Sequence, residues 1–323
     1  MRMTAPASRR LVGLLVVLVL AAGGSFCVLQ FWLLRPVGEG PAGPPVPGEP
    51  FAAPWTDREV VLLGIGDSVT AGFGASPGKS YVARLVDNPP DEFPDMRGKC
   101  LRAVLPGLRV ENVSVSGSDS LAHAKGQIPA LKPYPETVFG LVVMTSGGND
   151  LIHWYGRRPP EEGAMYGATL EQAQPWIAAF ESRLGGMLRD ITALFPGGCR
   201  IFLANIYDPS DGGADPRIVG LPRWPDAQPI LAAYNGVIAR CAAARDNVTL
   251  VDIHTEFLGH GVRCAQFWRP TYRSDDPHYW YYRNIEDPND RGYDALRRLF
   301  LRAIADTLGK RDWQEASPAA QGT

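Results

Sequence analysis

A serine flanked by glycines follows the first strongly apolar run beyond the amino-terminal region. Residues 60–63 have the composition of a buried strand, and Gly66, Asp67 and Ser68 come directly after it. A strand that ends in such a turn places a hydroxyl group at the edge of a sheet. Because a serine hydroxyl alone is a poor nucleophile, the chain must also supply a proton acceptor and donors for a developing oxyanion. Ser68 is therefore the candidate nucleophile.

Two further positions have the chemistry of oxyanion donors. Gly117 and Asn149 each follow an apolar, β-branched run, at residues 108–115 and 138–145. Glycine lets the backbone approach a substrate oxygen closely, and an asparagine amide is a neutral donor that can hold negative charge. We therefore expect the backbone N–H groups of Ser68 and Gly117, with the Asn149 side chain, to form an oxyanion hole.

These stretches resemble the SGNH branch of the GDSL esterase and lipase family, which is named for four blocks that carry Ser, Gly, Asn and His. Residues 66–72 match the first block, Gly117 suits the second, and residues 147–150 match the third in full. The resemblance covers about residues 59–308. It implies a three-layer α/β/α fold in which an ester is hydrolysed through an acyl-serine intermediate.

The fourth block departs from the family pattern. The family usually has Asp-x-x-His-Pro-Asn before its last helix, whereas residues 284–289 read Asn-Ile-Glu-Asp-Pro-Asn. Asp287 thus stands in the histidine position, but an ordinary carboxylate, with a pKa near ~3.9, accepts a proton from serine less well than imidazole near ~6.5. Asp287 is instead expected to be the N-cap of the last helix.

The histidines offer other candidates for the base. Asp275 and His278 alone preserve an Asp-x-x-His spacing in the region where the family histidine belongs. We therefore predict His278 as the general base and Asp275 as the carboxylate that orients it. His254, directly after the last predicted strand, is the second choice. The remaining histidines are His123, His153 and His260.

Strand-like and helix-like segments alternate along the chain. The strand-like runs are 60–63, 108–115, 138–145, 200–206 and 248–253, and the clearest helical segments are 178–195, 230–245 and 295–308. Such alternation predicts the α/β class: a three-layer α/β/α sandwich around a central parallel sheet, SGNH-hydrolase or flavodoxin-like, over residues 56–310. In such sheets the ligand site lies at the carboxyl ends of the strands. Residues 311–323 are predicted to be a disordered tail.

The amino terminus has a different composition. Residues 11–34 carry no charge, and at ~1.5 Å per residue they would cross a hydrocarbon core of ~30 Å. Three arginines precede this span and one follows it, which predicts an amino terminus in the cytoplasm and a main domain outside. We therefore expect residues 1–35 to be a cytoplasmic stub and signal-anchor, and residues 36–55 a Pro/Gly-rich linker. Secretion after signal-peptide cleavage near residues 21–24 is the alternative.

Charge and cysteine spacing argue against several other classes. A net charge of −2 without a basic stripe argues against nucleic-acid binding. Gly64 and Gly66 begin a dinucleotide fingerprint that Val69 breaks, so no cofactor is predicted. No cysteine spacing fits a metal site. Four cysteines outside the apolar span allow either two disulfides or buried free thiols. They are Cys100, Cys199, Cys241 and Cys264.

The sequence thus predicts a membrane-tethered serine ester hydrolase that acts outside the cytoplasm on a small-molecule or polysaccharide ester. One alternative is a non-catalytic carbohydrate- or partner-binding module on the same scaffold, prompted by the missing histidine of the fourth block. Another is a polysaccharide O-acetyl esterase, prompted by location alone. The oligomeric state is not predicted.

Overall fold

A five-stranded parallel sheet forms the centre of the protein. The computed structural model describes residues 5–152 and 166–309. The strands are β1 (Val60–Ile65), β2 (Leu108–Asn112), β3 (Phe139–Met144), β4 (Cys199–Ala204) and β5 (Val248–Val251), in the spatial order β2-β1-β3-β4-β5. Val60 of β1 lies opposite both Leu108 and Phe139. The parallel sheet predicted from the alternation of segments is confirmed.

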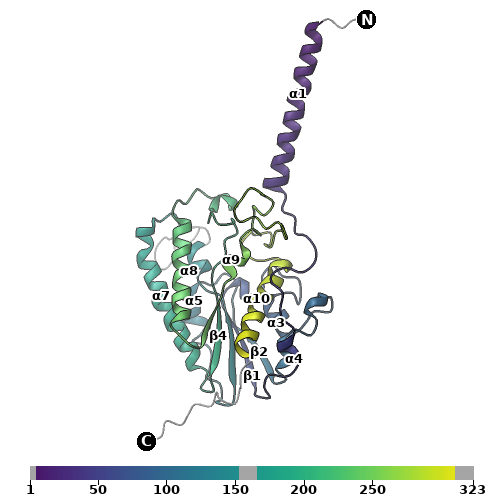
Figure 1. The fold of residues 1–323 in the computed structure, drawn as a ribbon. Coiled ribbons are helices and arrows are strands. Elements are labelled where there is room, and N and C mark those ends of the chain that lie inside the picture. The colour runs from purple at the N-terminus through teal and green to yellow at the C-terminus, as the bar shows by residue number, and fades with distance from the viewer. Residues whose placement is uncertain (1–4, 153–165, 310–323) are drawn as a thin grey trace.

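Helices cover both faces of the sheet (Figure 1). One face packs against α3 (Tyr81–Val86), α4 (Leu101–Val104), α9 (Ile253–Phe257) and α10 (Asp290–Leu308), and the other against α7 (Leu170–Ala193) and α8 (Ala227–Ala243). Because side chains alternate along a strand, Val60 and Leu62 join the first core while Val61 and Leu63 join the second. The predicted three-layer α/β/α sandwich is therefore confirmed.

Short helices and turns complete the chain. The short α-helices are α2 (Ser68–Ala71), α5 (Ser120–Ala122) and α6 (Gly148–Ile152). Short 3-10 and π segments are η1 (Leu29–Leu33), η2 (Glu49–Phe51), η3 (Pro94–Met96), η4 (His123–Gln127) and η5 (Pro216–Val219). Helices α2, α5 and α6 follow the carboxyl ends of β1, β2 and β3, so they occupy the end of the sheet where ligands bind in this architecture.

The last helix begins later than the sequence suggested. The N-cap of α10 is Asn289, whose side-chain oxygen accepts hydrogen bonds from the backbone N–H groups of Arg291 and Gly292 at 2.9 and 3.0 Å. The prediction that Asp287 caps this helix is therefore wrong. An asparagine two residues further on satisfies the free N–H groups, which leaves the Asp287 carboxylate available for another partner.

An apolar helix, α1 (Ala5–Val28), stands away from the sandwich (Figure 1). Together with η1 it gives a 23-residue stretch, Leu11–Leu33, which is long and apolar enough to cross a membrane. The segment that follows packs against the domain. Ala42 and Val46 are buried, and the Ala42 N–H donates to the Asp294 carboxylate at 3.0 Å. Part of the stretch expected to be a linker therefore lies against α10.

The cysteines are free thiols. All five lie within the described residues, and the four outside the apolar helix are buried. Of the two alternatives left open by the sequence, the structure therefore shows buried thiols and no disulfide.

Candidate active site

Ser68 lies where β1 passes into α2. Gly66 adopts φ +145°, and a Cβ at this position would lie 2.4 Å from Thr145 Oγ1, so only glycine fits. Asp67 caps α2, because its carboxylate accepts the Val69 N–H at 3.1 Å. Ser68 is partly exposed although Asp67 and Val69 on either side are buried. The turn therefore leaves Ser68 accessible between two buried neighbours.

The partner of this hydroxyl is a carboxylate. Asp287 accepts a hydrogen bond from the Ser68 side chain and another from Asn284 Nδ2 at 2.6 Å. Its carboxylate is 3% exposed, and this burial raises its pKa above the ordinary range while the two hydrogen bonds oppose the shift. A buried carboxylate with a raised pKa is a stronger proton acceptor than an ordinary one. The structure thus pairs Ser68 with a buried carboxylate at the position of the family histidine.

The turn that carries Asp287 is tight. The Tyr282 N–H donates to the Asp287 carbonyl at 2.6 Å, and the Asp287 N–H donates to Asn284 Oδ1 at 3.2 Å. Ile285 within this turn has φ +69°, a conformation that a β-branched residue adopts rarely. Strained backbone of this kind is found where the surrounding contacts fix a functional group, and here it lies two residues from the carboxylate that meets Ser68.

A second carboxylate lies beside the first. Asp67 is 6% exposed and accepts a hydrogen bond from Thr145 Oγ1 at 2.8 Å. Burial, with a smaller contribution from the negative charge of Asp287, raises the pKa of Asp67 to about 6. Two buried carboxyl groups that repel each other favour the state with a single charge. Their protonation is therefore coupled.

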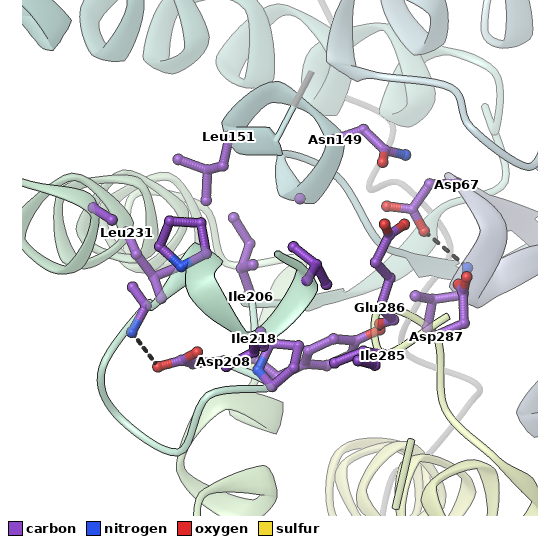
Figure 2. A pocket seen from close by; sticks show the side chains of 18 of the residues that line it. Asp67, Asn149, Leu151, Ile206, Asp208, Ile218, Leu231, Ile285, Glu286 and Asp287 are labelled. Carbon is purple, nitrogen blue, oxygen red and sulfur yellow. Dashed lines mark hydrogen bonds between the residues drawn. The ribbon is translucent and has the colours of Figure 1, made fainter. Parts of the chain in front are cut away.

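A cavity opens beside these groups (Figure 2). The acidic side chains of Asp67, Glu286 and Asp287 line one part of it, and Leu151 and Leu231 lie on the other side. Other apolar lining residues are Ile206, Ile218, Val219, Trp224 and Ile253. The cavity therefore has a polar end at Ser68 and an apolar remainder, which suits an ester whose acyl group is apolar.

One wall of the cavity comes from residues 207–219, the Gly- and Pro-containing stretch after β4. Asp208 is not free for chemistry, because it accepts hydrogen bonds from the backbone N–H groups of Ser210, Gly212 and Ala214 at 2.7–2.9 Å. Asp208 therefore holds this loop in shape, and the loop holds the apolar wall in place.

The structure brings Ser68 and Asn149 into this one cavity. Asn149 Nδ2 donates to the Ser118 carbonyl at 2.8 Å, and an amide nitrogen carries a second hydrogen. Gly117, with φ +83°, is on the adjoining exposed loop and does not line the cavity. The Ser118 hydroxyl lies 3.0 Å from the Gly66 carbonyl, so this loop is attached to the turn that carries Ser68.

A buried histidine fixes the same loop. His123 Nε2 lies 2.9 Å from Ser118 Oγ, and its Nδ1 lies 3.0 Å from Ser146 Oγ. Burial lowers the pKa of His123 to about 4, so the ring is neutral near pH 7. His123 thus joins the loops after β2 and β3 through two serine hydroxyls, and both of its ring nitrogens are engaged away from Ser68.

The structure does not bring His278 to Ser68. His278 Nδ1 is hydrogen-bonded to Asp276, not to Asp275, and Asp276 in turn accepts two hydrogen bonds from Arg291 Nη2 at 2.7 Å. The ring is packed against Gly38, where an added Cβ would lie 2.5 Å from its Cδ2. The amino-terminal segment therefore holds this histidine away from the cavity.

The other histidines also have different partners. His254 Nδ1 lies 2.7 Å from the Ile206 carbonyl, and His260 stacks on Trp280 with ring centroids 3.4 Å apart. No histidine within residues 5–152 and 166–309 lines the cavity. His153 lies outside the described residues. Of the side chains that the described structure gathers around Ser68, Asp287 is the one placed to accept its proton.

A parallel α/β sandwich with a serine, a carboxylate and an amide at the carboxyl ends of its strands is the architecture of a GDSL-type hydrolase. The family model "GDSL-like Lipase/Acylhydrolase family" matches residues 65–295. The chain belongs to this family, whose members hydrolyse esters.

The chain is also similar to several solved structures. An extracellular lipase from Streptomyces rimosus is 19% identical, with a TM-score of 0.51, over 76% of this chain and 99% of that one. An acetyl xylan esterase from Geobacillus stearothermophilus is 22% identical, with a TM-score of 0.45, over 77% and 97%. A lipase from a goat rumen metagenome is 18% identical, with a TM-score of 0.46, over 76% and 97%. No curated protein matches the chain.

Sequence reasoning set aside two residues that the structure places at the site. Alignment on Pro288 and Asn289 puts Asp287 at the histidine position, which was the available signal, but an ordinary pKa argued against it as a base. Asp67 was considered only as part of a turn. Both carboxylates differ from the expectation for the same reason, which is burial that the sequence does not display.

Proposed function

We propose that the protein is a membrane-tethered serine ester hydrolase in which Ser68 is the nucleophile and Asp287 replaces histidine as the base. The observation that carries this proposal is the hydrogen bond from the Ser68 hydroxyl to the buried Asp287 carboxylate. Burial makes that carboxylate a better proton acceptor than its type alone suggests.

The reaction follows from this pair. Asp287 takes the proton of Ser68 as Oγ attacks the ester carbonyl, and the oxyanion is held by Asn149 Nδ2 with the N–H group of Ser68. The protonated Asp287 then donates to the leaving alcohol as the carbon–oxygen bond breaks. Water, deprotonated by Asp287, attacks the acyl-serine, and the protonated Asp287 returns that proton to Ser68 Oγ as the acid leaves.

The cavity favours an ester with an apolar acyl group. Apart from the acidic end, its walls are largely apolar side chains such as Leu151, Ile206 and Leu231 (Figure 2). An anionic acyl group would meet Asp67, Glu286 and Asp287, and the repulsion disfavours it.

The location proposed for the domain is the outer side of a membrane. The stretch Leu11–Leu33 is long enough to span a bilayer, and three arginines precede it against one that follows, which favours an amino terminus in the cytoplasm. Packing of Ala42 and Val46 in the core supports retention of the region just after the span with the folded domain.

The test is hydrolysis of a short-chain acyl ester by full-length protein and by Ser68→Ala. We expect no turnover by the variant and an unchanged Tm, and we expect the wild-type serine to react with a fluorophosphonate probe. A wild-type serine that stays inert to the probe, in folded protein, would support the non-catalytic binding module instead.

A further inference from the structure

The exposed apolar side chains of the domain are unevenly distributed. Beyond residue 37, the large apolar side chains that are exposed in the described residues are Phe73, Val110, Val115, Leu250, Phe267 and Trp268. Val110 and Leu250 belong to the edge strands β2 and β5. The other four lie in loops that follow the carboxyl ends of strands, which is the end of the sheet where Ser68 lies.

Two of these loops adjoin the site directly. The Phe73 N–H donates to the Ser68 carbonyl at 2.9 Å, and the Val115 N–H donates to the Gly66 carbonyl at 3.0 Å. Phe73 and Val115 are both exposed next to the turn that carries Ser68, so their apolar surface is available for contact with an apolar partner.

The loop that carries Phe267 and Trp268 is in contact with the end of the apolar helix. Phe31 packs edge-on against both rings, with centroids 5.7 and 5.1 Å apart, and the Phe31 carbonyl accepts a hydrogen bond from Gln266 Nε2 at 3.0 Å. Phe267 and Trp268 are nevertheless 62% and 51% exposed. The aromatic patch is therefore continuous with the proposed membrane span.

The same loop is fixed to the wall of the cavity. Asp211 accepts hydrogen bonds from the N–H groups of Gly259 and Gly261 at 3.0 and 2.7 Å, and the Val262 N–H donates to the Pro209 carbonyl at 2.9 Å. Pro209 lines the cavity. Contacts thus connect Phe31 at the helix end, through the loop that carries Phe267 and Trp268, to the cavity wall at Pro209. Figure 1 shows that α1 leaves the domain at the end opposite the carboxyl terminus of α10.

We propose that Phe267 and Trp268, with Phe73 and Val115, form a membrane-docking face that holds the open end of the active site against the bilayer surface. Tryptophan is favoured at the level of lipid headgroups, where its apolar ring is sheltered and its N–H stays hydrated, and Phe side chains add apolar surface that an interface can bury. The substrate class that follows is an ester presented at the bilayer, such as an acylated amphiphile. This inference rests on the membrane anchor and esterase activity of the proposed function.

The test uses full-length protein in liposomes with and without lipids brominated on the acyl chains, which quench nearby tryptophan. The difference in tryptophan fluorescence between wild type and Trp268→Phe gives the emission of Trp268 alone. Trp55 is the matched control, because it packs near Gly309 at the other end of the sheet, and Trp55→Phe isolates its emission. We expect brominated lipid to quench the Trp268 difference and to leave the Trp55 difference unchanged. An unquenched Trp268 difference would overturn the docking face.

A second experiment distinguishes the role of the docking face from catalysis itself. The double variant Phe267→Ser/Trp268→Ser should hydrolyse a short water-soluble ester at the wild-type rate and an ester lipid in the same bilayer more slowly. Equal rates of hydrolysis of the ester lipid by wild type and variant would overturn the role of the docking face in substrate presentation. A wild type that is quenched at Trp268 but hydrolyses neither ester would leave the docking face standing while the proposed esterase fails.

Discussion

Replacement of Asp287 by asparagine removes the proposed base and little else. The amide oxygen still accepts a hydrogen bond from Ser68, and the turn keeps its Asn284 Oδ1 contact with the backbone N–H of residue 287. General-base catalysis contributes about 10²–10⁴ in rate, which corresponds to about 2.7–5.4 kcal/mol in activation free energy. We therefore expect Asp287→Asn to lower kcat by that factor with a small change in KM.

The pH profile provides an independent check. The base acts in its ionised form, so wild-type kcat/KM should fall as pH drops through the raised pKa of Asp287, which is coupled to Asp67 with a pKa of about 6. The residual activity of Asp287→Asn should lack this acid limb. Turnover by short-chain ester hydrolysis, measured across pH 4–9, gives both quantities.

The controls are two groups outside the cavity. Asp276→Asn changes a carboxylate of the same type, which is the partner of His278 in the structure, and His278→Ala removes the imidazole that the Asp-x-x-His spacing favoured. Both should keep kcat near the wild-type value. If His278→Ala lost about 10³ in kcat while Asp287→Asn kept full activity, the base assignment drawn from the Ser68–Asp287 contact would be refuted.

Two further predictions concern neighbouring groups. Asn149→Ala should lower kcat by about 10²–10³ with an unchanged Tm, because the amide acts on the oxyanion, and unchanged turnover in the same ester assay would exclude that role. Asp67→Asn should raise the free energy of unfolding by up to about 3 kcal/mol above pH ~6, because burial raises the pKa of Asp67 to about 6 from ~3.9 in the unfolded chain. The folded wild type holds this proton more tightly, so the gain should appear as pH rises from ~4 to ~6 and should vanish below ~4, which urea unfolding at pH 4 and pH 7 would measure.

The sheet could be predicted because burial on both faces makes its central strands continuous apolar runs. All six residues of β1 and of β3 are buried, and both strands were found. The position at which β2 ends could not be predicted from its apolar run. Its run was expected to reach residue 115 but ends at Asn112, whose side chain donates to the Thr70 carbonyl at 3.0 Å and accepts the Ser114 N–H at 3.2 Å. The backbone N–H groups of Val113 and Val115 still donate to the Gly64 and Gly66 carbonyls, so the apolar run continues past the end of the regular strand.

The candidate site also contains residues that local sequence predicts and one that depends on contacts between distant segments. Ser68 and Asn149 could be predicted from local sequence, because each follows an apolar strand in a glycine-containing turn where the backbone can approach a substrate. The choice of base depended on which distant turn meets Ser68. His278 is drawn away by contacts with residues far off in the chain, since Gly38 packs on its ring and the N–H of the next residue, Tyr279, donates to the Pro36 carbonyl at 2.7 Å. Spacing within residues 275–278 carries no information about these contacts.

The contacts around Asp287 also extend to the segment that follows the apolar helix. Asn289, the N-cap of α10, donates from Nδ2 to the Tyr279 carbonyl at 2.9 Å, and the Tyr279 N–H donates to the Pro36 carbonyl. Arg291 in the first turn of α10 donates to the carbonyls of Glu39 and Gly40 at 2.6 and 2.9 Å. Because a buried carboxylate and a strained turn both cost folding free energy, the site requires support from neighbouring contacts. Part of that support comes from the stretch just after the apolar residues Leu11–Leu33, so the unit able to hold Asp287 against Ser68 begins near Pro36 rather than at β1.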